Sequence, residues 1–161
     1  MQHVALSIFD KELCLPFFDR LTELFHEHHH SEEQDPDEYE SLLYRVSRPY
    51  TPEMLDMIDG WMGLEDRAWR AETQREVLLS LYAIRYPDTL LIESLTDKAR
   101  SDIRRLSAYL HFTHHTYSIW DDDTRKGLGK LGIDIPEMKE ADPFIYGAYV
   151  SSIELLKDVA P

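Results

Sequence analysis

Prolines that follow helix-capping residues recur along this chain and constrain its fold strongly. Asp35-Pro36, Thr51-Pro52 and Asp142-Pro143 each pair a side-chain oxygen suited to a helix N-cap with a proline suited to the first helical turn. The segments that follow carry apolar residues three or four positions apart, the period of one helix face. Only residues 3–9 resemble a strand. We therefore predict an all-α fold, a single-domain multi-helix bundle of about seven to eight helices spanning residues 1–161.

The apolar periodicity places the individual helices. They are predicted over residues 17–25, 36–48, 52–62, 65–86, 88–98, 100–119 and 143–157. In the second of these, the apolar face consists of Tyr39, Leu42, Leu43 and Val46. The stretch 121–132 stays open, because each of its three glycines disfavours a helix by about 1 kcal/mol relative to alanine.

Length and composition limit the cellular context. A chain of 161 residues with 18 aromatic side chains can bury a core, and a domain of this size buries roughly 70 % of its unfolded surface. No apolar run reaches the ~18–20 residues of a membrane span, and residues 1–6 lack the basic start of a secretory signal. Cys14 is the single cysteine, which excludes a disulfide within the chain. We predict a cytoplasmic protein with no membrane partner.

Charge is distributed unevenly along the chain. The 17 basic and 31 acidic residues give a net charge of −14. Residues 1–66 hold 4 basic and 16 acidic side chains and therefore account for −12 of it. Such a surface repels the phosphate backbone, which disfavours nucleic-acid binding. It favours a basic protein partner. The alternative interpretation is that the negative net charge serves only solubility.

The C-terminal part carries the one family resemblance to an inhibitor. Residues 117–150 resemble the C-terminal part of PoNi-type immunity proteins, which neutralise PoNe-type DNase toxins delivered between competing bacteria. The matching residues are Trp120, then Leu131-Gly132-Ile133-Asp134, then Pro143-Phe144-Ile145-Tyr146. Asp121-Asp122-Asp123 replaces a more apolar and acidic run of that family. The resemblance implies an immunity or antitoxin-like protein that binds and occludes a basic toxin.

The predicted partner-binding residues lie in the most acidic stretch of the chain. Six carboxylates fall within nine residues around one tyrosine, a pattern typical of an aromatic anchor surrounded by steering charge. A solvated acidic loop is the alternative interpretation. The predicted set is Glu32, Glu33, Asp35, Asp37, Glu38, Tyr39 and Glu40. No catalytic residue and no cofactor are predicted.

Two further functions remain open at this point. His111 and His115 are four residues apart, the HxxxH spacing that lets two imidazoles share one metal ion on a helix face. The run from His111 to His115 is similar to the H-x-x-H-H run of DinB-like helical bundles, which implies a metal-dependent enzyme; a third ligand is missing. The other alternative is an acidic mimic of nucleic acid that inhibits a defence or regulatory protein.

Overall fold

The structure is a computed structural model, and it describes residues 36–47, 50–83, 95, 102–130 and 132–159. These residues form α-helices and no β-strand, which confirms the all-α class for the part described. The helices are α2 (Pro36–Arg45), α3 (Pro52–Trp61), α4 (Ala71–Ala83), α6 (Ile103–Thr113), α7 (Asp122–Lys130) and α8 (Pro143–Val159). A search of the described helices finds none long and apolar enough to cross a membrane.

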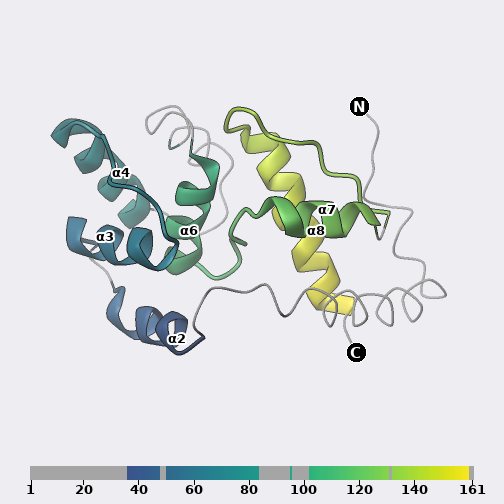
Figure 1. Cartoon of the computed structure of the whole chain (residues 1–161), viewed down its shortest axis with the longest axis horizontal. Coiled ribbons are helices and arrows are strands. Elements are labelled where there is room, and N and C mark those ends of the chain that lie inside the picture. Colours follow the sequence, from purple (N-terminus) through teal and green to yellow (C-terminus); the bar gives the residue numbers. More distant parts are fainter. Residues whose placement is uncertain (1–35, 48–49, 84–94, 96–101, 131, 160–161) are drawn as a thin grey trace.

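The described helices form two groups (Figure 1). Helices α2, α3, α4 and α6 lie together on one side, and α7 and α8 lie together on the other. The first group packs around apolar side chains that are at most 1 % exposed: Leu55, Ile58, Val77, Leu81, Leu106 and Leu110. These come from α3, α4 and α6; α3 and α4 both pack on α6, and α2 packs mainly on α3.

The chain between α6 and α7 joins the two groups. The hydroxyls of Tyr146 and Tyr149, both buried in α8, each donate a 2.9 Å hydrogen bond to a backbone carbonyl, that of Ser118 and that of Ile119 respectively. The Trp120 ring lies 4.8 Å from the Tyr149 ring, centroid to centroid. Helix α8 therefore holds residues 118–120 through both polar and aromatic contacts.

Two predicted helices are shorter in the structure. The helix predicted over 65–86 begins at Ala71. Backbone groups of residues 64–70 form contacts that are incompatible with a helix. The Glu65 carbonyl, for example, accepts from the Arg105 guanidinium and not from the N–H four residues later. The helix predicted over 100–119 ends at Thr113, since His114 is extended and the Trp120 N–H turns back to the Ser107 hydroxyl, at 2.7 Å.

The remaining helix predictions agree with the structure, apart from the end of one helix, or lie outside the described residues. The predictions over 52–62 and 143–157 are confirmed within two residues, and the helix predicted over 36–48 ends at Arg45. The helix predicted over 17–25 lies outside the described residues, as does nearly all of that predicted over 88–98.

Helix α7 forms although it contains two glycines. Its first turn is capped by Asp121, whose carboxylate accepts from the Thr124 N–H at 2.7 Å and from the Thr124 hydroxyl at 2.9 Å. Asp122 pairs with Arg125 at 2.7 Å and with Lys126 at 2.8 Å, one turn further along. The cap and these pairs offset the low helix propensity of glycine.

Candidate functional site

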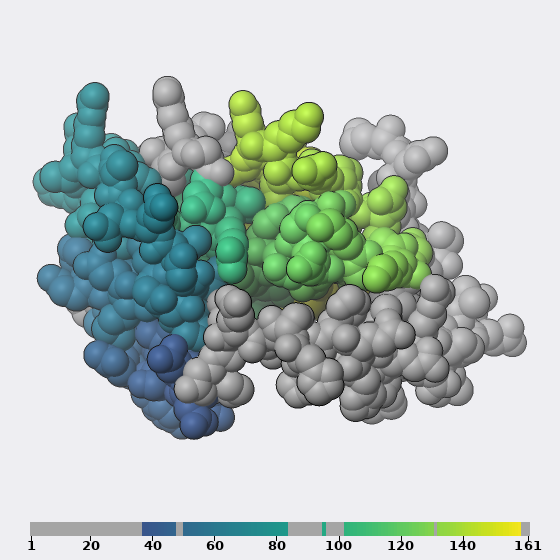
Figure 2. All heavy atoms as spheres, in the orientation of Figure 1, coloured from purple at the N-terminus to yellow at the C-terminus, as the bar shows by residue number. Residues whose placement is uncertain are grey.

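Helix α2 carries the described part of the predicted partner-binding segment and lies at an edge of the molecule, dark blue in Figure 2. One face of it is inside the protein, where Leu42 and Val46 are buried. Tyr39 shares this face, and its ring lies 5.5 to 5.9 Å from the rings of Trp61, His111 and Phe112. The structure therefore separates Tyr39 from the neighbouring carboxylates: it anchors α2 to α3 and α6.

The opposite face of α2 is open to solvent. Tyr44 is 87 % exposed, and it lies four residues after Glu40 and seven after Asp37, so the three share one side of the helix. Asp37, Glu38 and Glu40 are all exposed, and Glu38 lies at the margin of this side, one turn before Leu42. We call Asp37, Glu38, Glu40 and Tyr44 the acidic face of α2.

Only part of the predicted set can be placed. Glu32, Glu33 and Asp35 lie outside the described residues. Tyr44 is not among the predicted residues, although its spacing from the apolar residues of the helix indicates that it is exposed. In a helix whose buried face carries Leu42 and Val46, a residue two after Leu42 and two before Val46 points the other way. The aromatic side chain beside the carboxylates is thus Tyr44.

A chain of hydrogen bonds attaches α2 to the centre of the bundle. The Nδ1 atom of His111 lies 2.7 Å from the Tyr117 carbonyl oxygen. The Nε2 atom of the same ring lies 2.8 Å from the Tyr39 hydroxyl oxygen. Because a carbonyl oxygen only accepts, Nδ1 carries the proton; in the neutral ring, Nε2 then accepts from Tyr39. Burial lowers the pKa of His111, with His115 and Lys157 adding to the effect and the Tyr117 carbonyl opposing it, so the neutral ring is favoured.

The arrangement of His111 and His115 bears on the metal alternative. Their rings are 5.5 Å apart and nearly perpendicular. Nδ1 of His111 carries the proton that it donates to the Tyr117 carbonyl, and the lone pair of Nε2 accepts from Tyr39, so neither nitrogen is available to a shared ion in this arrangement. Within the described part of the chain, no three His, Cys, Asp or Glu side chains are grouped as metal ligands.

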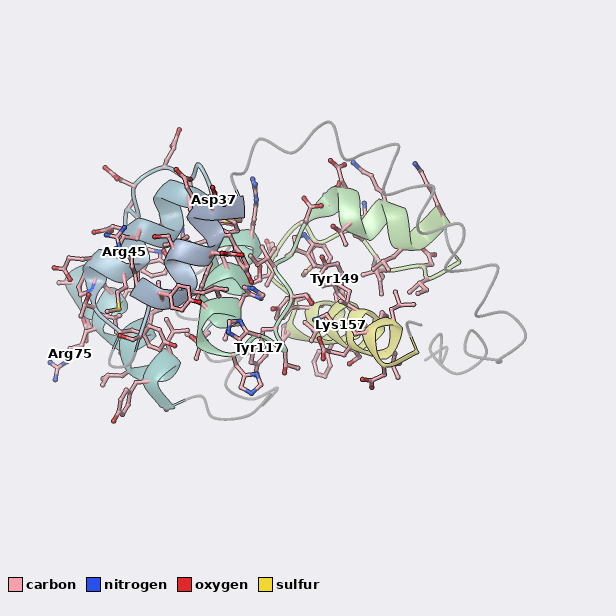
Figure 3. The ribbon with its side chains drawn as sticks, turned by 90° about the horizontal axis from the view of Figure 1, so that it is seen from below. Asp37, Arg45, Arg75, Tyr117, Tyr149 and Lys157 are labelled. Atoms are coloured by element: carbon pink, nitrogen blue, oxygen red, sulfur yellow. The ribbon has the colours of Figure 1, made fainter. Side chains whose placement is uncertain are left out.

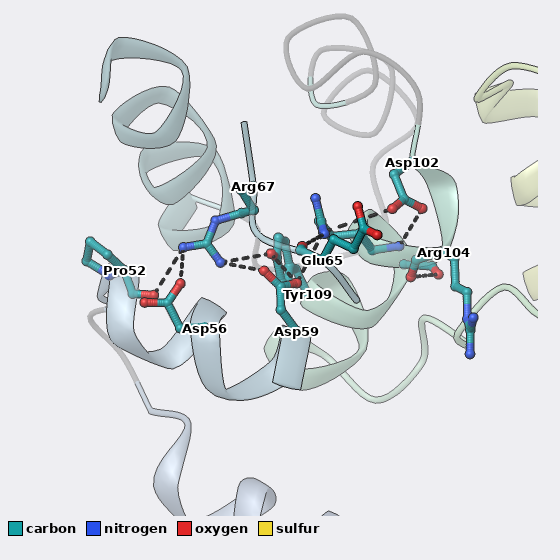
Figure 4. Close-up of polar contacts among 10 residues, drawn as sticks. Pro52, Asp56, Asp59, Glu65, Arg67, Asp102, Arg104 and Tyr109 are labelled. Carbon is teal, nitrogen blue, oxygen red and sulfur yellow. Dashed lines mark hydrogen bonds and ion pairs between the residues drawn. The ribbon is translucent and has the colours of Figure 1, made fainter. Parts of the chain in front are cut away.

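A second polar cluster is buried between α3, α6 and residues 64–70 (Figure 4). The Asp59 carboxylate on α3 accepts from Arg67 at 2.6 Å through one oxygen and from the Tyr109 hydroxyl at 2.6 Å through the other. Arg105 forms an ion pair with Asp59 at 3.2 Å. Arg67 also reaches Asp56, at 2.5 Å, on the exposed side of α3.

The charges of this cluster are arranged around one carboxylate. The side chains of Asp59, Arg67 and Arg105 are each at most 10 % exposed, so two guanidinium groups depend on Asp59 for compensation inside the protein. Burial, together with the Asp59 carboxylate, raises the pKa of Tyr109, which stays protonated and donates to Asp59. The side chains of the cluster are buried and paired with one another, so the cluster fixes α3 on α6 and we assign it a structural role.

Comparisons with known proteins leave the family open. Neither the protein-family models nor the curated proteins nor the solved structures contain a match to this chain.

Proposed function

We propose that this chain is an immunity or antitoxin-like protein that binds a basic bacterial toxin in the cytosol and occludes its active site. DNase toxins of bacterial competition are the first class to test, because they carry a positive surface along the DNA cleft. Inhibition is by mass action, without turnover or cofactor. In this proposal the whole chain acts as one bundle of seven to eight helices.

The acidic face of α2 is the observation that carries the proposal. Tyr44 presents a large side chain to solvent on a helix whose other side is buried against the bundle. A tyrosine loses little conformational entropy on binding and offers both an apolar ring and a hydroxyl. The exposed carboxylates around it supply hydrogen-bond acceptors for lysine and arginine side chains of the partner.

The net charge supports the same partner class. A charge of −14 on 161 residues attracts a cationic protein before contact and raises the association rate at low salt. The same field repels nucleic acid, so the chain and DNA compete for one surface of a nuclease toxin. In this proposal the negative field of the whole molecule speeds association with the toxin, and the contacts of α2 slow its dissociation.

The acidic face also separates this proposal from the nucleic-acid mimic. A mimic needs carboxylates spaced like phosphates and tolerates many basic partners. Tyr44 standing out from α2 instead favours a cavity of matching shape on one partner. We therefore prefer a dedicated partner to a general one.

Growth rescue tests the proposal. The protein encoded directly upstream is expressed in a heterologous bacterium, alone and together with this chain. We expect the upstream protein to arrest growth alone, and this chain to restore growth and to co-purify with it in a stoichiometric complex. A harmless upstream protein, or toxicity that this chain does not relieve, contradicts the pairing.

A further inference from the structure

We propose that the hydrogen-bonded chain Tyr39–His111–Tyr117 is an acid-sensitive latch that fastens α2 to the bundle. It joins three parts of the fold: α2 through the Tyr39 hydroxyl, α6 through the His111 ring, and the loop after α6 through the Tyr117 carbonyl. In the view of Figure 3, Tyr117 lies between the ribbons of α6 and α8. The role of the latch in presenting the acidic face rests on the proposed function, whereas the latch itself does not.

Protonation disturbs one particular bond of the chain. With Nδ1 already committed to the Tyr117 carbonyl, an added proton enters at Nε2, the atom that accepts from Tyr39. Nε2 then becomes a donor, and the Tyr39 hydroxyl proton must find another acceptor in a half-buried position beside the Trp61 and Phe112 rings. The Tyr39 oxygen can still accept from Nε2, but a hydroxyl proton without an acceptor in such a position weakens the attachment of α2.

The groups around His111 add to this effect. Lys157 on α8 and His115, just after α6, both disfavour a positive charge on His111, while the Tyr117 carbonyl favours it. Lys157 is itself paired with Glu154, at 2.7 Å, and it also lowers the pKa of Tyr39, against the larger rise caused by burial. Both residues favour the neutral form of His111, whereas burial keeps Tyr39 protonated at neutral pH.

The direction of the pH dependence follows from these shifts. The pKa of His111 is lower in the fold than the ~6.5 of an unfolded histidine. The unfolded or undocked state therefore binds more protons, and the stabilisation is complete above about pH 6.5 and is lost as the pH falls through the folded pKa. The latch is closed at neutral pH and opens in acid.

Hydrogen exchange on the free chain tests the latch. The protection of the α2 amides is measured relative to that of the α3 amides at pH 7.5 and at pH 5.0, after correction for intrinsic exchange. We expect this ratio to fall about five-fold in acid, the worth of one hydrogen bond. The substitution Tyr39→Phe should lower the ratio by a similar factor already at pH 7.5 and remove most of its pH response.

Two histidine substitutions provide the controls. His111→Gln should abolish the acid response, while His115→Gln, at the exposed neighbouring histidine, should keep it. An unchanged ratio in the wild-type chain, or an acid response of full size in His111→Gln, overturns the latch. If His111→Gln fails to fold, the ¹⁵N shifts of His111 in the wild-type chain decide: an Nε2–H tautomer at neutral pH overturns it, and an Nδ1–H tautomer that titrates below pH 6.5 supports it. Neither result depends on a toxin, so growth rescue can fail while the latch holds.

Discussion

Replacing Asp59 by alanine is expected to lower the free energy of unfolding by about 3–5 kcal/mol, the cost of removing one partner from a buried ion pair. Asp59 is the carboxylate that compensates the buried guanidinium groups of Arg67 and Arg105, and it also accepts from Tyr109. Alanine leaves these cations and the phenol without that partner in a place that water cannot reach freely. Urea unfolding followed by circular dichroism measures the change.

Asp56 supplies a matched control on the same helix. It also pairs with Arg67, but its side chain is 67 % exposed. Asp56→Ala is therefore expected to cost less than about 1 kcal/mol, as exposed ion pairs do. Equal costs for the two substitutions would show that burial of the Asp59 cluster does not determine its contribution.

Replacing Tyr44 by alanine is expected to weaken binding to the cognate toxin by about 30-fold, which corresponds to the ~2 kcal/mol of an interface hot spot. The stability of the free chain should change by less than about 0.5 kcal/mol, because the Tyr44 side chain packs little against the bundle. Isothermal titration calorimetry with the partner found by growth rescue gives the affinity.

Tyr82 on α4 is the control for this substitution. It is 57 % exposed and lies outside the acidic face of α2. Tyr82→Ala should leave the affinity within about two-fold of the wild type, a difference well under 1 kcal/mol. An equal loss for both tyrosines would mean that α2 has no special part in the interface.

Local signals in the sequence predicted much of the fold. The cap-proline pairs placed the starts of α2, α3 and α8, because proline fits the first helical turn. The Asp142 carboxylate also caps α8, whereas the Thr51 side chain makes no cap hydrogen bond at α3.

Local signals failed where distant residues decide. The start of α4 depends on the contact from Arg105 to the Glu65 carbonyl, forty positions apart in the chain. The end of α6 depends on the contact from the Trp120 N–H to the Ser107 hydroxyl. Periodicity assigns charged side chains to the surface, so it could not reveal Asp59 and Arg67 as interior residues.

The candidate site was predicted in part. The acidity of the segment around α2 is a property of composition, and the exposure of Glu38 and Glu40 agrees with it. The aromatic residue was chosen by its position among the carboxylates, which favoured Tyr39. The helical phase of the same segment places Tyr39 with Leu42 on the buried face and leaves Tyr44 outside. The Tyr39–His111 bond joins residues 72 positions apart, and no local pattern predicts it.

The most direct test of the account is the rate at which the chain associates with its toxin after reversal of the α2 charges. Glu38→Lys/Glu40→Lys is compared with Glu137→Lys/Glu140→Lys, an exposed pair in the segment before α8, so the net charge changes equally. Stopped-flow fluorescence at low salt should show association slowed at least about ten-fold by the α2 pair, because charges at the contact steer most strongly. The control pair should slow it by less than about three-fold, through net charge alone. Equal rates for the two variants would contradict the assignment of the acidic face of α2 as the binding surface.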